Sequence, residues 1–406
     1  MSILSGKRIL LGVTGSIAAY KAADLASKLT QAGAQVDVLL STAAEKFITP
    51  LTFQSVTGRR AYVDADLWGG EAHVLHVGLG HQTDLLVIAP CTANTLAKLA
   101  HGQADSLLTV TALAATCPLI VAPAMDGGMY DHPATQSNLN ILRGRGAYVI
   151  EPASGHLASG LTGRGRLPET PDLLGHIRLV LGRKGALVGR TVVVTAGGTA
   201  EPIDPVRVIT NRSSGKQGYA LAQAAVDAGA QVTLISTPVT LTPPVGARVV
   251  PVETAQQMLA AVLKESQGCD ALIMAAAVAD FRPKTRAGNK IKKEGGLPQI
   301  ELEATEDILK TVSAPGVERS GAQRPRVVAG FAAESQSLME NAAVKLQSKK
   351  LDLIAANDIS AEGAGFAVET NRITLLFADG RREALSLMSK NEVAEIIVAR
   401  IAALLE

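Results

Sequence analysis

The segment AGAQVDVLLST (residues 32–42) recurs in nearly the same letters as AGAQVTLIST at residues 228–237. Each copy follows an Ala-rich helical stretch, which in turn follows an apolar strand and a glycine turn. A strand, a glycine turn and a helix returning to a parallel strand make up a βαβ unit. Two short matches can arise by chance, but the matching spacing of the flanking turns favours two fused α/β domains.

The length and composition of the chain set the class of protein. With 406 residues, and about 100–200 residues per domain, two to four domains are expected. The net charge of +2 provides no field that would attract nucleic acid or a membrane. The cysteines Cys91, Cys117 and Cys269 are scattered, which argues against a disulfide framework or a Cys-rich zinc site. No apolar stretch approaches the length of a membrane span, so we expect a soluble, cytoplasmic protein.

Strand and helix patterns alternate along both halves, which predicts parallel sheets covered by helices. In the first half, strands are expected at 8–13, 35–40, 85–89, 118–122 and 147–151, and helices at 16–32, 93–100, 106–116, 133–145 and 169–182. In the second half, strands are expected at 191–195, 231–236, 247–251, 270–276, 326–331, 352–356 and 373–378, and helices at 215–229, 254–266, 305–313, 337–350 and 389–404. The polar stretch 181–190 is the expected linker.

The turns of the first half are rich in hydroxyl groups. GVTGSIAAYK (12–21) is not GxGxxG, and Ser41 and Thr42 stand where a dinucleotide fold usually has an acidic residue. Hydroxyls suit a mononucleotide phosphate or a ribityl chain better than a nicotinamide dinucleotide. APCTANT (89–95) adds a further hydroxyl-rich turn at a helix start. Each turn alone is explained by ordinary N-capping, but several at strand ends favour a ligand.

Histidines occur only in the first half, several of them in HVLHVGLGH (73–81). Neither a paired cysteine nor an H-E-x-x-H motif accompanies this segment, which disfavours a metal site. His76 is instead a candidate acid or base, the alternative being a polar histidine in a loop. The glycine-rich stretches 123–130 and 154–166 are expected to be loops.

The second half carries two candidate anion sites. NRSSGKQG (211–218) is not a P-loop, because Thr210 replaces the required glycine, but it opens a helix with hydroxyls and a lysine. Asp280 ends an apolar strand, where a carboxylate can hold Mg²⁺. The segment 281–298 is expected to be a long basic loop that closes over a triphosphate, or else a solvated surface.

Several motifs appear together in a characteristic order: GVTGSIAAYK, HVLHV before DLLVIAP, TANT, PAM before MY, and ASGLTGRGR. This set resembles the flavin-dependent cysteine decarboxylases. With its second half included, the chain resembles the bacterial family of bifunctional phosphopantothenoylcysteine decarboxylase/phosphopantothenate–cysteine ligases of coenzyme A synthesis. The resemblance covers nearly the whole sequence.

This resemblance implies a flavodoxin-like, doubly wound domain over 1–186 and a Rossmann-like ligase domain over 187–406, assembled as a homo-oligomer that is a dodecamer in the family. FMN would supply the electron sink for loss of CO2, since the cysteine-derived thiol is oxidised to a thioaldehyde that delocalises the carbanion. His76 falls on the catalytic histidine. The implied FMN-binding residues are Gly15, Ser16, Ser41, Cys91, Thr92, Ala93, Asn94 and Met125.

Two residues depart from the family pattern of the decarboxylase. Asp126 stands where an asparagine commonly holds the substrate carboxylate; an ionised aspartate would repel that group, whereas a protonated one would donate to it. Ser159 stands where a cysteine commonly returns a proton to the enethiolate, and a hydroxyl is a much weaker acid than a thiol. We expect activity by a modified route through Ser159, His156 or Asp126.

In the ligase half of the family, the carboxylate of 4′-phosphopantothenate attacks CTP to give an acyl-cytidylate, and the amine of cysteine displaces CMP. Such chemistry needs cations and a divalent metal around the phosphates. By resemblance, Lys290 neutralises the α-phosphate, Asn211 holds the acyl-cytidylate and Asp280 binds Mg²⁺. The implied CTP-binding residues are Ala275, Ala276, Asp280, Lys290, Thr305, Glu306, Asp307, Ile308, Phe331, Lys345 and Lys349.

The sequence thus predicts a bifunctional enzyme that uses FMN, Mg²⁺ and CTP on small-molecule substrates. One alternative is a ligase whose flavin domain is an inactive scaffold, which Asp126 and Ser159 make conceivable. Another is a flavin-fold regulatory binding protein, against which the ligase motifs argue. A nicotinamide oxidoreductase is disfavoured because both glycine turns lack GxGxxG.

Overall fold

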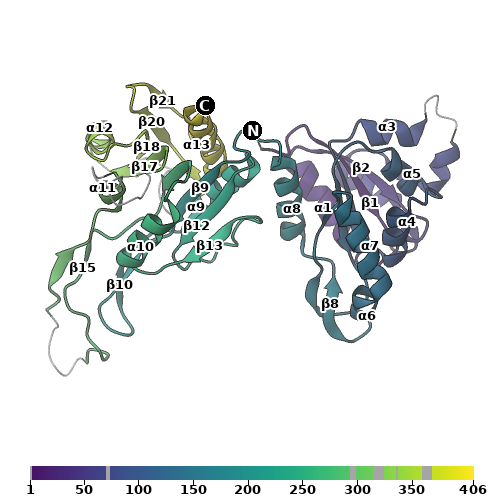
Figure 1. Cartoon of the computed structure of the whole chain (residues 1–406), viewed down its shortest axis with the longest axis horizontal. Coiled ribbons are helices and arrows are strands. Elements are labelled where there is room, and N and C mark those ends of the chain that lie inside the picture. Colours follow the sequence, from purple (N-terminus) through teal and green to yellow (C-terminus); the bar gives the residue numbers. More distant parts are fainter. Residues whose placement is uncertain (1, 70–73, 293–298, 314–323, 335–336, 359–367) are drawn as a thin grey trace. The chain divides into compact units, whose positions relative to one another are not determined.

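The computed structural model describes residues 2–69, 74–292, 299–313, 324–334, 337–358 and 368–406. The chain divides into two compact units, Met1–Leu181 and Gly182–Glu406. This division falls within the stretch predicted to be the linker. Each unit is built around a sheet of its own (Figure 1).

A parallel sheet with the order β3-β2-β1-β4-β5-β6 forms the centre of the first unit. Its strands are β1 (Arg8–Val13), β2 (Gln35–Leu40), β3 (Ala61–Val63), β4 (Leu85–Cys91), β5 (Leu119–Pro123) and β6 (Tyr148–Val149). Without the short edge strand β3, this is the 2-1-3-4-5 order of flavodoxin-like folds. The predicted doubly wound fold is therefore confirmed.

The helices of this unit are α1 (Ala19–Gln31), α2 (Pro50–Thr57), α3 (Leu75–His81), α4 (Ala93–His101), α5 (Leu107–Ala114), α6 (Gly127–Asp131), α7 (Pro133–Gly144) and α8 (Thr170–Gly182). They cover both faces of the sheet, because successive side chains of a strand point to opposite faces. Ile9 and Leu11 of β1 belong to the core shared with α1 and α8. Leu10 belongs to the opposite core, shared with α4, α5 and α7.

Three segments of the first unit differ from the sequence-based expectation. Residues 75–81 form helix α3 rather than a loop, and residues 127–131 form the short helix α6. The stretch expected as a glycine-rich loop contains an antiparallel hairpin of β7 (Ala153–His156) and β8 (Thr162–Arg166). These elements are short and lack clear periodicity, which is why the apolar pattern does not reveal them.

The second unit has an eight-stranded sheet with the order β13-β12-β9-β14-β17-β18-β20-β21. Its strands are β9 (Thr191–Ala196), β12 (Gln231–Ser236), β13 (Arg248–Pro251), β14 (Ala271–Met274), β17 (Val327–Glu334), β18 (Leu353–Asp358), β20 (Ile373–Phe377) and β21 (Arg382–Ala384). The first six positions run parallel in the 3-2-1-4-5-6 order of a Rossmann fold, and β20 and β21 add an antiparallel edge. The Rossmann-like prediction is confirmed.

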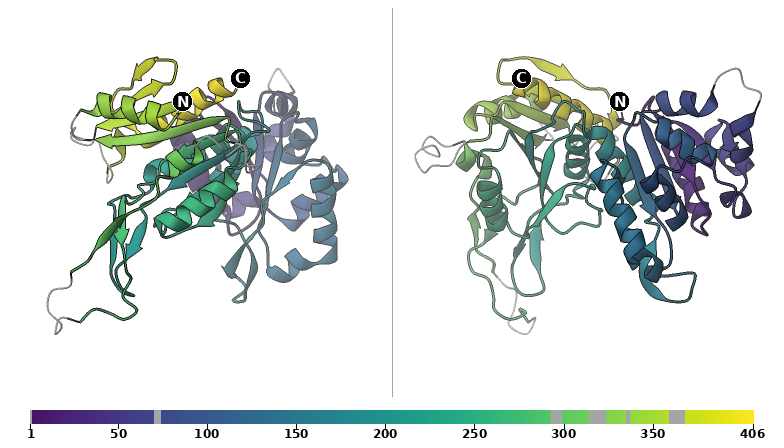
Figure 2. Two further views of the ribbon diagram at one scale, coloured as in Figure 1. Left: turned by 60° about the vertical axis from the view of Figure 1, so that its left-hand side comes forward. Right: turned by 45° about the vertical axis from the view of Figure 1, so that its right-hand side comes forward.

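The remaining elements of this unit are α9 (Lys216–Asp227), α10 (Ala255–Glu265), α11 (Ile308–Val312), α12 (Leu338–Ser348), α13 (Lys390–Leu405), and the short strands β10 (Ala200–Pro202), β11 (Val208–Thr210), β15 (Phe281–Pro283), β16 (Leu302–Ala304), β19 (Thr370–Asn371) and β22 (Met388–Ser389). The long basic loop expected at 281–298 begins with β15, which pairs with β16. Residues 293–298 lie outside the described part of the chain. The pairs β10–β11 and β15–β16 project from the sheet as one arm (Figures 1 and 2).

None of the helices in the described ranges combines the length and the apolar character needed to cross a membrane.

Gly218 sets how closely α9 packs on β9. A β-carbon at this position would lie 2.5 Å from Cβ of Ala196 and 2.8 Å from the carbonyl oxygen of Thr195. We expect Gly218→Ala to destabilise the second unit by about 1–3 kcal/mol, because backbone atoms must shift. Hydrogen exchange of the β9 and α9 amides measures this change. Gly144→Ala, at a site with no atom within 4 Å, is the control and should cost nothing; equal effects would contradict the packing argument.

Candidate functional site

A polar cavity of about 550 Å³ lies at the carboxyl edge of the first sheet. It is lined by the turns that follow β1, β2, β4 and β5, as parallel strands require. Of the residues predicted to bind FMN, those on its wall are Gly15, Ser16, Ser41, Thr92, Ala93, Asn94 and Met125. The structure thus brings together nearly the whole predicted set.

Hydrogen bonds fix the shape of this cavity. The hydroxyl of Thr14 donates to the carbonyl of Pro90 (2.8 Å) and accepts from the N–H of Thr92 (3.0 Å), which joins the ends of β1 and β4. Thr92 is the N-cap of α4, and its side chain accepts from the N–H of Thr95. Thr92 is thus an N-cap that also lines the cavity, so the two roles weighed in the sequence are compatible at this turn.

Cys91 is the exception among the predicted FMN-binding residues. Its side chain is fully buried in the apolar core beneath the cavity, and burial raises the pKa of its thiol strongly. The thiol of Cys91 therefore does not line the cavity, and a role of Cys91 in FMN binding stays a prediction that involves its backbone. Its carbonyl accepts from the N–H of Ala124 and joins the turns after β4 and β5.

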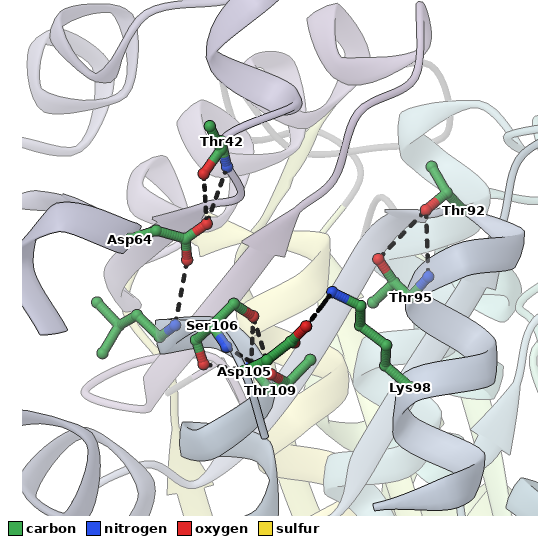
Figure 3. Close-up of polar contacts among 9 residues, drawn as sticks. Thr42, Asp64, Thr92, Thr95, Lys98, Asp105, Ser106 and Thr109 are labelled. Atoms are coloured by element: carbon green, nitrogen blue, oxygen red, sulfur yellow. Dashed lines mark hydrogen bonds and ion pairs between the residues drawn. The ribbon is translucent and has the colours of Figure 1, made fainter. Parts of the chain in front are cut away.

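The sequence analysis missed two charged residues of the cavity, Asp64 and Lys98 (Figure 3). Asp64 accepts from the N–H and the hydroxyl of Thr42 (3.0 and 2.7 Å) and from the N–H of Leu107 (3.1 Å). Lys98 forms an ion pair with Asp105 at 2.8 Å and lowers the pKa of that carboxyl. Asp64 follows β3, whose three residues are too short for the strand pattern to reveal.

A second cavity, of about 520 Å³, shares Ser16, Ala124 and Met125 with the first. Its wall includes Tyr20 and Lys21 of α1, Asp126, and the β7–β8 hairpin with His156 and Ser159. The two departures from the family pattern therefore meet in one cavity, next to the predicted cofactor site.

Asp126 and Ser159 are directly bonded. The hydroxyl of Ser159 donates to Oδ2 of Asp126 at 2.7 Å, and the N–H of Gly128 donates to Oδ1 at 2.9 Å. These two hydrogen bonds, that from Ser159 first, hold the pKa of Asp126 below its usual value. In this arrangement the carboxylate of Asp126 accepts both hydrogen bonds, which favours its ionised form over the protonated, donating form.

Cationic groups line the same cavity. Lys21 is buried, and its ammonium donates to the carbonyl of Leu167 (3.0 Å) and to Glu169 (2.7 Å). Arg166 also pairs with Glu169, at 3.2 Å. These charges offset the carboxylate of Asp126, so an anionic substrate is not excluded by electrostatics.

His76 lies apart from both cavities. It is half-buried on α3, and within the described residues it is not on the wall of either cavity. The structure of one chain therefore does not bring the predicted catalytic histidine to the predicted cofactor site.

In the second unit, a small cleft of about 60 Å³ opens at the N-terminus of α9. Its wall includes Ser213, Ser214, Gly215 and Phe331, together with Asn357. Asn357 is 7% exposed, and its side-chain oxygen has no hydrogen-bond partner among the described residues. An orphaned buried acceptor beside the N-terminus of a helix is the arrangement expected of a ligand site.

The loop after β14 is held beside this cleft by threonines at the end of β9. Thr195 accepts from the N–H groups of Ala275 and Ala276, both at 3.1 Å. The side-chain amide of Asn211 donates to the carbonyls of Ala277 (3.3 Å) and Val278 (3.2 Å). Asn211 and the predicted CTP-binding alanines therefore lie in one network.

The other predicted CTP-binding residues gather around α11 and β17. Thr305 donates its N–H to the carbonyl of Asp280 (2.9 Å), and Lys345 donates to the carbonyl of Phe331 (2.8 Å). Lys349 forms an ion pair with Asp307 at 2.8 Å. Burial would raise the pKa of Asp307, but hydrogen bonds from Lys349 and the N–H of Lys310 hold it below its usual value.

The side chains of Lys290 and Asp280, unlike those of Lys345 and Lys349, are exposed. The side chain of Lys290 is exposed on the loop that follows β15, and Asp280 is an exposed single carboxylate. Among the described residues, no group of three or more His, Cys, Asp or Glu side chains is arranged to hold a metal. Mg²⁺ at Asp280 would therefore depend on phosphate oxygens for most of its ligands.

Comparison with known proteins identifies both units. Residues 2–182 match the Flavoprotein family, and residues 187–405 match the DNA/pantothenate metabolism flavoprotein C-terminal domain. The chain is 45% identical over 405 residues to the Coenzyme A biosynthesis bifunctional protein CoaBC of Bacillus subtilis, covering 99% of this chain and 98% of that one. The chain belongs to the family of bifunctional coenzyme A biosynthesis proteins. Family membership confirms the prediction of an enzyme with decarboxylase and ligase halves and a flavoprotein domain.

A further full-length relative and a solved domain are also similar to this chain. The CoaBC protein of Vibrio cholerae is 44% identical over 400 residues and covers 98% of each chain. The solved C-terminal domain of a CoaBC protein is 41% identical, covers 55% of this chain and 98% of that domain, and has a TM-score of 0.46.

The contact between Ser159 and Asp126 predicts a measurable titration. In Ser159→Ala the pKa of Asp126 should rise toward the ordinary value of about 3.9, because its strongest hydrogen bond is removed. A lowered folded-state pKa stabilises the native state above the unfolded pKa, and this contribution is lost as the pH falls through the folded pKa. Carbon NMR of the carboxyl group measures the shift. Ser154→Ala, in the same hairpin, is the control; an unchanged pKa in Ser159→Ala would refute the contact.

Proposed function

We propose that this chain ligates 4′-phosphopantothenate with cysteine at the expense of CTP, and then decarboxylates the product with FMN to 4′-phosphopantetheine. The observation that carries the proposal is the pair of cavities in the first unit that share the wall Ser16, Ala124 and Met125. One is lined by hydroxyls and backbone turns, as a phosphorylated cofactor requires. The other offers a neighbouring place for a substrate beneath a hairpin.

The first cavity suits FMN. Its volume lies within the usual range for ligand pockets, and its hydroxyl-lined turns suit a phosphate and a ribityl chain. When bound, the flavin supplies the electron sink that a cysteine-derived carboxylate lacks. Gly15 allows the close approach of the turns, because a β-carbon there would lie 2.4 Å from Cβ of Ala43.

In the second cavity we assign the substrate carboxylate to the side lined by Lys21 and Arg166, away from the ionised Asp126. The hydroxyl of Ser159 is held by Asp126 and faces the same space. We assign to Ser159 the relay of a proton to the enethiolate: its hydroxyl gives up one proton as it takes another from water, so that no alkoxide is left beside Asp126, and His156 in the same wall is the alternative donor.

In the second unit, we place the phosphates of CTP at the N-terminus of α9, where the N–H groups of Gly215 and the following residues favour an anion. The orphaned oxygen of Asn357 would accept from a ligand hydroxyl, an amine or a metal-bound water. Lys290, Lys345 and Lys349 supply positive charge, and Asp280 with the phosphates would hold Mg²⁺.

The position of His76 supports assembly as a homo-oligomer. Exposed apolar side chains occur on the elements packed with or next to α3: Val74, just before α3, is 59% exposed, Leu113 on α5 66%, and Trp68, in the segment 64–68 that packs on α5, 89%. Exposed apolar side chains on neighbouring elements favour a protein contact. We propose that His76 acts in the cavity of a neighbouring copy; the dodecamer is the size that the family resemblance favours.

An assay of both half-reactions tests the proposal. The purified protein, given 4′-phosphopantothenate, cysteine, CTP and Mg²⁺, should release pyrophosphate and CO2 in equal amounts. Lys290→Gln should suppress both products, and supplied 4′-phosphopantothenoylcysteine should then restore CO2 but not pyrophosphate; His76→Asn should release pyrophosphate alone. Pyrophosphate without CO2 from the unchanged protein would select the ligase with an impaired decarboxylase domain. If neither pyrophosphate nor CO2 were released, the regulatory binding protein would be the better reading. An equal rate with ATP would overturn the choice of CTP.

Subunit mixing tests the shared active site. Gly15→Ala should lose the flavin, and His76→Asn should keep it, so neither alone decarboxylates. Co-expressed in equal amounts, they should recover about a quarter of the decarboxylase sites, because one such pairing in four combines an intact pocket with an intact histidine. Absence of recovery in verified mixed oligomers would place His76 in its own chain.

A further inference from the structure

Asp204 is a buried carboxylate at the turn between β10 and β11. It is 1% exposed and uses its two oxygens for different partners. Oδ1 accepts from the N–H groups of Val206 and Arg207, both at 2.8 Å, and so closes the turn locally. Oδ2 accepts from the guanidinium of Arg207 (2.9 Å) and from the N–H of Ile291 (3.2 Å), which lies on a different segment.

The segment that Asp204 reaches is the loop after β15, and three further observations fix it there. The guanidinium of Arg207 donates to the carbonyl of Ile291 at 3.2 Å. The N–H of Ala287 donates to the carbonyl of Ile203 at 2.9 Å. Strands β10 and β15 also lie side by side at the base of this arm (Figures 1 and 2). Both backbone groups of Ile291 are thus bonded to the Asp204–Arg207 pair.

Lys290 immediately precedes Ile291. Its side chain is exposed, so the direction in which it points depends on the backbone to which it is attached. If the loop moved away, the buried Oδ2 of Asp204 would lose the hydrogen bond from Ile291. Loss of a hydrogen bond by a buried, charged acceptor raises the free energy of the folded state. Burial raises the pKa of Asp204, but the N–H donors of Val206, Ile291 and Arg207 outweigh it and hold the pKa below its usual value. The carboxylate is therefore ionised at neutral pH.

We infer that Asp204 is a positioning residue for the ligase reaction: it holds the backbone at Ile291 and thereby aims the ammonium of Lys290 at the reacting phosphate. This inference rests on the proposed role of Lys290 in the ligase half. Misplacement of a reacting group by about 1 Å costs on the order of 100-fold in rate, so a hydrogen bond remote from the substrate has a large expected effect.

The separate use of the two oxygens permits a selective variant. In Asp204→Asn the amide oxygen can still close the turn, while the amide NH2 replaces Oδ2 and can accept neither from the N–H of Ile291 nor from the guanidinium of Arg207, so both links to the loop are weakened. We expect kcat for pyrophosphate release to fall about 10- to 100-fold with little change in KM, because Lys290 acts on the transition state. Decarboxylation of supplied 4′-phosphopantothenoylcysteine should stay unchanged.

Asp379 provides a matched control. It also closes a turn through the N–H of Arg381 (3.0 Å) and pairs with that guanidinium (2.6 Å), but these contacts, within the described part of the chain, are local to the β20–β21 turn. Asp379→Asn should leave kcat for pyrophosphate release unchanged. Trypsin cleavage after Lys290, followed by mass spectrometry, should accelerate in Asp204→Asn and not in Asp379→Asn.

A double-mutant cycle separates positioning from a general structural role. If Asp204 acts through Lys290, Asp204→Asn should cause no further loss in the Lys290→Gln background. An equal loss in both backgrounds, a ligase rate within twofold of the unchanged protein, or unchanged cleavage after Lys290 would each overturn the inference. Full ligase activity in Lys290→Gln alone would instead overturn the proposed role of Lys290.

Discussion

Parallel pairing of β1 with β2 and β4 brings the carboxyl ends of three strands to the same edge of the first sheet. The turns that leave those ends therefore converge, and their hydroxyls and N–H groups face one cavity. The second sheet repeats this constraint, where β9 and β14 end beside the N-terminus of α9. Both candidate sites therefore lie where parallel strands end, one in each sheet.

The hydrogen bonds and ion pairs of the buried and cavity carboxylates then determine which groups are held in place at each site. In the first unit, Ser159 and the N–H of Gly128 keep Asp126 ionised, so the carboxylate acts as an acceptor and fixes the hairpin above it. In the second unit, Asp307 pairs with Lys349, while Asp204 ties the loop of Lys290 to a turn. The carboxylates at these sites serve mainly to place other groups.

The central strands and the helices between them could be predicted from the sequence because their apolar periodicity is strong. Hairpin β7–β8, helix α3 and strand β3 could not, since each is short and owes its form to neighbours rather than to its own pattern. Asp64 was not predicted to line the cavity because β3, the strand that precedes it, is too short for its sequence pattern to be recognised. The sequence also could not show that the side chain of Cys91, the last residue of β4, points into the core, because strand residues alternate between faces.

By itself, the sequence determined the two α/β units, the turns that carry the anion-binding groups and the family to which they belong, because these depend on local pattern and on motif spacing. Tertiary structure decided the pairing of Ser159 with Asp126, the orphaned oxygen of Asn357 and, within the described residues, the absence of His76 from the walls of both cavities. These properties depend on distances between residues far apart in the chain, which spacing along the sequence does not encode.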